Sequence, residues 1–65
     1  MDFTRLLIIT GMTMEELKSI PRIALENIID AMNDRLLNAW QPAPKRQEIE
    51  YQIKCYKELI TILNL

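Results

Sequence analysis

Two apolar stripes with heptad spacing, one on each side of a proline-containing loop, constrain the fold of this chain more than any other feature. The first comprises Leu25, Ile29, Met32, Leu36 and Ala39, and the second comprises Ile49, Ile53, Tyr56, Ile60 and Leu63. When the stripes are paired in reverse order, the two residue numbers always add up to 88 or 89. Residues on two antiparallel helices stay level only if their numbers have a constant sum. The stripes therefore predict an antiparallel helical hairpin.

Prolines mark the ends of the predicted helices. Pro21 fits the first position of a helix, because that position needs no backbone N–H donor. Pro42 and Pro44 stop the same helix and stiffen the connection. We expect a single small all-α domain over residues 1–65. Its elements are one or two short N-terminal helices within residues 3–20, a long helix over 21–40, a loop over 41–45 and a last helix over 46–63. We expect the short helices to pack on the open end of the hairpin, opposite the loop.

The N-terminal segment contains two further helix signals. Asp2 can cap a first helix that ends near Gly11, a residue that tolerates left-handed backbone geometry. The apolar run 6–9 would also suit a strand, but the sequence contains no partner strand for it. Thr13 and Glu16 have the spacing of a capping box at the start of a second short helix.

A chain of 65 residues buries a small core, so an extra source of stability is expected. Cys55 has no second cysteine to pair with, and the chain has no histidine to complete a zinc site. Oligomerisation is the remaining source, and the unpaired thiol fits a reducing compartment. No apolar run is long enough to span a bilayer, and no signal peptide is evident. We therefore expect a soluble, cytoplasmic protein.

A second set of apolar residues follows one edge of the predicted hairpin. In the heptad lettering, Ile28 and Leu59 occupy g positions, and Ala24, Ala31, Cys55 and Ile62 occupy c positions. Two arrangements would cover this edge: the N-terminal helices fold back onto it, or the edge of a second chain packs against it and forms a homodimeric four-helix bundle.

Three large side chains fall outside both sets. Leu37 and Tyr51 occupy outward positions at the same level of the hairpin, and Trp40 lies close by at the loop. Tryptophan and tyrosine are enriched in protein interfaces, so these residues are candidates for protein binding, with Lys45 and Arg46 at the rim. The alternative for Trp40 is that its ring folds over the loop and closes the end of the core.

No arrangement of residues indicates catalysis, a metal or a cofactor. Cys55 lacks a histidine that could activate it and is expected to be a buried structural thiol. Glu26, Asp30 and Asp34 form an acidic ridge that lacks further oxygen ligands for a cation. A solvated helix face is the simpler interpretation of this ridge, and a weaker one is contact with a basic partner.

The formal net charge of −1 argues against a dedicated nucleic-acid binder. Residues 7–20 resemble a helix-turn-helix in outline, but Glu15 and Glu16 occupy the place where such a unit contacts DNA. An amphipathic membrane-surface helix would need a basic polar face, which is missing.

The sequence favours a non-catalytic interaction module, an adaptor or an inhibitor of another protein, that acts as a homodimer. Small helical chains of this kind are common among phage and bacterial accessory proteins, which is an analogy of architecture alone. The alternative is a small nucleic-acid-associated regulator of transcription or replication.

Overall fold

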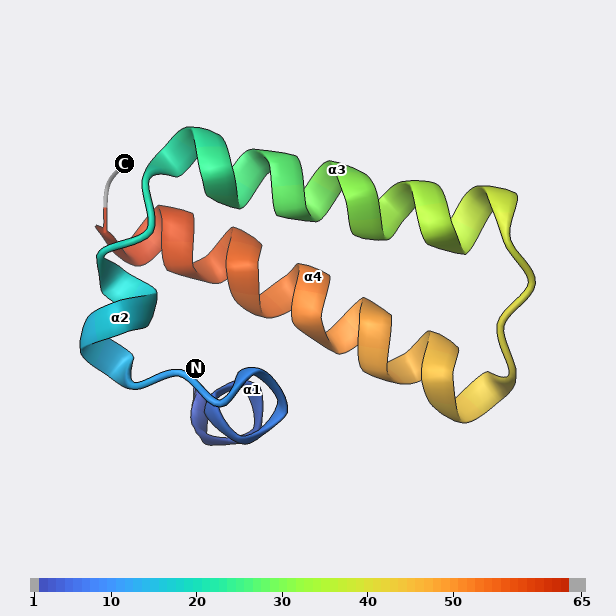
Figure 1. Ribbon diagram of the computed structural model, residues 1–65, viewed down its shortest axis with the longest axis horizontal. Helices are drawn as coiled ribbons and strands as arrows, with labels where there is room; N and C mark the ends of the chain where they lie inside the picture. Colours follow the sequence, from blue (N-terminus) through green and yellow to red (C-terminus); the bar gives the residue numbers. More distant parts are fainter. Residues whose placement is uncertain (1, 64–65) are drawn as a thin grey trace.

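A computed structural model describes residues 2–63 of the chain. Over these residues the protein is all-α, with the four helices α1 (Thr4–Thr10), α2 (Met14–Lys18), α3 (Arg22–Asn38) and α4 (Ala43–Leu63). The two long helices lie side by side and run in opposite directions, as the stripes predict (Figure 1). The short helices α1 and α2 lie on the side of α4 that faces away from α3 (Figure 1). The end of the hairpin where residues 39–42 join α3 to α4 is called the loop end, and the opposite end is called the open end.

Local signals explain the two short helices. The Asp2 carboxylate accepts hydrogen bonds from the backbone N–H of Thr4 at 2.9 Å and from its hydroxyl at 2.6 Å, which ties down the start of α1. Gly11 ends α1 with φ of 71°, and its N–H donates to the carbonyl oxygen of Leu7. A residue with a Cβ is strained at this φ, so glycine is required there by the backbone alone.

The capping box of α2 forms as predicted. Thr13 Oγ1 accepts a hydrogen bond from the Glu16 N–H at 3.1 Å, and Glu16 Oε1 accepts one from the Thr13 N–H at 3.0 Å. The chain then turns at Pro21, which has an extended ψ of 150° and caps α3. Pro21 is thus the N-cap and not the first residue of the helix, so α3 begins one residue later than predicted.

The loop is shorter and earlier than predicted. Helix α3 ends at Asn38 and Ala39 is extended, so Ala39 leaves the first stripe and is exposed. Helix α4 begins at Ala43 and not at Arg46, since Pro44 is tolerated within a first helical turn. The Arg46 N–H already donates to the carbonyl oxygen of Pro42 at 2.9 Å.

Helix α4 is the central element of the core. The predicted stripe of α4, which runs from Ile49 to Leu63, faces α3, where Leu25 and Ile29 are buried. Another row of side chains follows α4 with the same heptad spacing, and we call it the second stripe of α4. It consists of Lys45, Glu48, Gln52, Cys55, Leu59 and Ile62. Its middle members Gln52, Cys55 and Leu59 are buried. Cys55 and Leu59 belong to one cluster with Leu6 of α1, Leu17 of α2 and Phe3, which precedes α1.

The second stripe of α4 shows whether the N-terminal helices or a second chain would cover the apolar edge of the hairpin. The N-terminal helices fold back onto α4 and bury Cys55 and Leu59 completely. Ala24 and Ile28 on α3 are half-buried, whereas Ala31 and Ile62 remain exposed. The stripe is polar at Lys45 and Glu48, the members nearest the loop end. The apolar part of the edge is thus covered mainly within one chain.

Candidate interaction surface at the loop end

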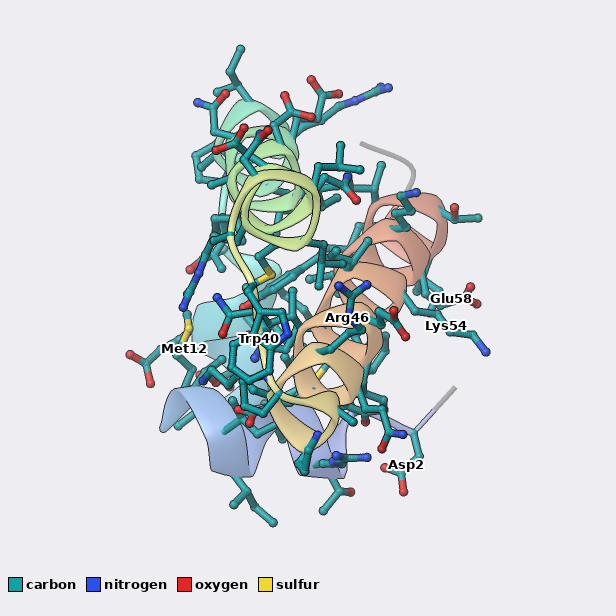
Figure 2. All side chains as sticks on the ribbon, turned by 90° about the vertical axis from the view of Figure 1, so that its right-hand side faces the viewer. Asp2, Met12, Trp40, Arg46, Lys54 and Glu58 are labelled. Carbon is teal, nitrogen blue, oxygen red and sulfur yellow. The ribbon has the colours of Figure 1, made fainter. Side chains whose placement is uncertain are left out.

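The loop end presents an aromatic and an aliphatic side chain to solvent. Trp40 is 84% exposed and Leu37 is 83% exposed, the highest values among the large hydrophobic side chains of residues 2–63. Trp40 follows the extended Ala39, which directs the chain away from the helix axis. The interpretation in which Trp40 closes the end of the core is wrong, because the ring stays in solvent. Figure 2 views the molecule from this end, with Trp40 and Arg46 labelled.

The backbone around Trp40 is held from both sides. Before it, the Ala39 N–H donates to the carbonyl oxygen of Arg35 at 3.1 Å and completes the last turn of α3. After it, Pro42 and Pro44 restrict the chain, and α4 begins at once. Only residues 39–42 lie between the two helices. The loop is therefore short and stiff, which lowers the entropy that a partner must pay to bind there.

Lys45 and Arg46 lie in the first turn of α4, beside the loop. Lys45 Nζ is 4.0 Å from Glu48 Oε2, and both side chains are partly exposed. Arg46 is exposed. We call Leu37, Trp40, Lys45 and Arg46 the loop-end surface.

Tyr51 does not belong to this surface, so its predicted place beside Leu37 is wrong. Its hydroxyl donates to the carbonyl oxygen of Asp2 at 3.4 Å, and the guanidinium of Arg5 lies 4.6 Å from the centre of its ring. Tyr51 lies about half a turn round α4 from Ile49, which faces α3. It is level with Leu37 along the hairpin but faces α1 on the other side of α4.

The surroundings of Tyr51 also change its acidity. A side-chain hydrogen bond with Cys55, followed by desolvation, raises the pKa of Tyr51 above its ordinary value, and the nearby Arg5 opposes the shift. The cation over the ring is a favourable cation–π geometry. The stripe pattern did not predict the contact of Arg5 with Tyr51 or the burial of Gln52. Gln52 could have been found from its place in the second stripe of α4.

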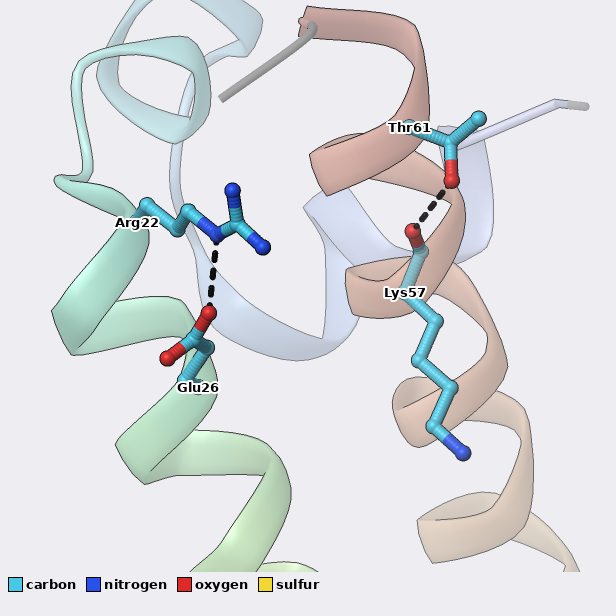
Figure 3. Close-up of polar contacts among 4 residues, drawn as sticks. All are labelled: Arg22, Glu26, Lys57 and Thr61. Carbon is cyan, nitrogen blue, oxygen red and sulfur yellow. Dashed lines mark hydrogen bonds and ion pairs between the residues drawn. The ribbon is translucent and has the colours of Figure 1, made fainter.

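The acidic ridge on α3 is a solvated face. Glu26, Asp30 and Asp34 are all exposed, and Arg22 Nε donates to Glu26 Oε1 at 2.8 Å (Figure 3). On α4, the Thr61 hydroxyl donates to the carbonyl oxygen of Lys57, an ordinary contact within one helix (Figure 3). Residues 2–63 contain no pocket and no group of three or more His, Cys, Asp or Glu side chains that could hold a metal ion.

The segment with the outline of a helix-turn-helix has a different use in this fold. Helix α2 is only five residues long, with Glu15 and Glu16 exposed in its first turn. Leu6 of α1 and Leu17 of α2 are both fully buried in the core cluster. The two helices thus cover α4.

Comparison of the chain with protein-family models, with curated proteins and with solved structures finds no match in any of the three. Among residues 2–63, no helix combines the length and the apolar character needed to cross a membrane.

Proposed function

We propose that this protein is a small, non-catalytic interaction module, an adaptor or inhibitor that binds another protein through its loop-end surface. The observation that supports the proposal is the exposure of Trp40 and Leu37 at 84% and 83%. Burial of a tryptophan side chain is worth about 3–5 kcal/mol at about 25 cal/mol per Å². The free protein leaves this gain unused, and a partner that covers the ring would obtain it.

The position of these residues supports binding rather than folding as their role. The buried side chains are those of Phe3 and of residues in the four helices, and none of them lies within residues 30–48. Removal of Trp40 or Leu37 should therefore leave the fold intact. A cytoplasmic location belongs to the same proposal, and the buried, unpaired Cys55 is consistent with it.

Affinity capture from an extract of the source organism tests the proposal. The double variant Leu37→Ser/Trp40→Ser should lose a captured partner by roughly thirtyfold or more, as expected when an interface hot spot is removed. The control is Ile8→Ser, which removes an apolar side chain of α1 that is 77% exposed. Circular dichroism checks that both variants keep their helices.

Two results would contradict the proposal. One is capture that is equally strong with the wild type and the loop-end variant. The other is loss of the partner in the control variant alone, which would move the binding surface to the exposed face of α1.

A further inference from the structure

The charge of the loop end differs from that of the rest of the chain. Residues 35–47 contain Arg35, Lys45 and Arg46 and no aspartate or glutamate. The rest of the chain has five cationic and nine acidic side chains. The exposed Trp40 therefore lies within the positive segment of a protein whose formal net charge is −1.

Two carboxylates border this segment, and neighbouring side chains engage both. Asp34 Oδ1 accepts a hydrogen bond from Asn38 Nδ2. Glu48 is the ion-pair partner of Lys45. Within residues 2–63, no carboxylate lies within ion-pair distance of Arg35 or Arg46, and both arginines are exposed.

We propose that the loop end binds an acidic peptide segment that also has an apolar or aromatic side chain. Trp40 and Leu37 contact the apolar side chain, and Arg35 and Arg46 bind the carboxylates. A guanidinium forms two parallel hydrogen bonds with one carboxylate, which gives geometric selectivity as well as affinity. This inference rests on the proposed function and adds the chemistry of the partner to it.

A nucleic acid fits the same surface less well. Single-stranded nucleic acids bind to aromatic side chains that stack successive bases along a positive track. Trp40 is the only tryptophan of the chain, and Tyr51 is held under Arg5 against α1. The acidic ridge on the exposed face of α3 would also repel phosphates.

A second copy of this chain is the other acidic candidate, because Glu26, Asp30 and Asp34 are exposed on α3. A two-fold pairing could set this ridge against the loop end of the other copy. Two of its three carboxylates are already engaged, however, because Glu26 accepts a hydrogen bond from Arg22 and Asp34 accepts one from Asn38. The observations therefore favour a different protein as the occupant.

Quenching of tryptophan fluorescence tests the local charge directly, since Trp40 is the only tryptophan. Compared with the neutral reference N-acetyltryptophanamide at the same ionic strength, Trp40 should show an added preference for quenching by iodide over caesium, because the arginines attract the anion. The Arg35→Gln/Arg46→Gln variant should lose this preference. The control Lys54→Gln/Lys57→Gln, which neutralises two exposed lysines on the outer face of α4, should keep it. A wild-type preference no greater than that of N-acetyltryptophanamide would overturn the proposal.

Titration with defined probes tests the binding. The probe is a capped peptide with two Phe–Leu pairs flanked by glutamates, and its counterparts have lysine or glutamine in place of each glutamate. The glutamate peptide should shift the Trp40 emission to the blue with saturation. Because hydrogen bonds to charged groups are worth about 1.5–3 kcal/mol, the Arg35→Gln/Arg46→Gln variant should bind it roughly tenfold or more weakly. The lysine control variant should bind it as the wild type does.

Three outcomes would overturn the inference. They are no binding of the glutamate peptide at millimolar concentration, tighter binding of single-stranded oligothymidylate, and self-association that the arginine substitutions abolish. These failures are distinct from failure of the proposed function. If capture depends on Trp40 and Leu37 while the peptide does not bind, the interaction module stands and only the acidic partner is lost.

Discussion

Single residues decide how the N-terminal segment is held against α4. The N-cap of α1 is Phe3 and not Asp2, but the Asp2 carboxylate accepts a hydrogen bond from the N–H of Thr4. The carbonyl oxygen of Asp2 accepts a hydrogen bond from the Tyr51 hydroxyl. Arg5, one turn further along, places its guanidinium over the Tyr51 ring. Tyr51 therefore links α4 to the start of the chain through both its ring and its hydroxyl.

Alkaline pH should weaken this link. Because the pKa of Tyr51 is raised in the folded state, the protonated hydroxyl is favoured there, and the resulting stability is present at neutral pH. It is lost as the pH rises above the ordinary tyrosine pKa and through the raised value. Thermal unfolding followed by circular dichroism should show a smaller fall in Tm between pH 8 and about pH 11 for Tyr51→Phe than for the wild type. Identical pH dependence in the two proteins would contradict this assignment.

At the scale of the elements, short-range signals set the ends of the helices. Gly11 ends α1, the capping box starts α2, Pro21 separates α2 from α3, and Pro42 precedes α4. Each signal acts within about one turn of the chain, so the sequence alone is sufficient to place it. The error at α4 arose from Pro44, which can lie inside a first turn as well as before it.

Loss of the capping box should destabilise the whole domain, because α2 buries Leu17 in the core. Thr13→Ala should lower the free energy of unfolding by about 1 kcal/mol, within a range of about 0.5–2 kcal/mol for such caps. Urea denaturation measures the change. Thr61→Ala is the matched control: its hydroxyl donates to the carbonyl oxygen one turn earlier, and its removal should change stability by less than about 0.5 kcal/mol. A loss as large in the control as in Thr13→Ala would refute the role of the cap.

At the scale of the whole molecule, the two ends of the hairpin differ. The loop end has exposed Trp40 and Leu37 beside cations. The open end has Ile23 and Ile62, which are 69% and 54% exposed. Because α1 and α2 already bury Cys55 and Leu59, these two isoleucines are the main apolar surface at the open end for a second chain.

The homodimer remains a prediction. It now rests on the exposed Ile23 and Ile62 alone, so the two chains would meet at their open ends. Sedimentation equilibrium at high micromolar concentration should then give about twice the chain mass of 7.7 kDa. Substitution Ile62→Lys should return the mass to that of one chain, since a buried lysine charge opposes association. A single species of 7.7 kDa at all concentrations would exclude the dimer.

The sequence by itself determined the helical class, the antiparallel hairpin and most of the stripe residues. These features depend on local backbone geometry and on the periodic burial of side chains, and both can be recognised from residues within a few turns of one helix. Leu37 could be assigned to the outside because it does not fit the stripes. For Trp40 the sequence left two positions open, and the structure decided for solvent.

Only the tertiary structure decided which side of α4 the N-terminal helices cover. That choice makes Tyr51 part of an internal contact, buries Gln52 and leaves Ile62 exposed. The contact between Asp2 and Tyr51 joins residues 49 positions apart in the chain. Heptad spacing describes which residues share a face of one helix, but it does not specify which distant segment packs against that face.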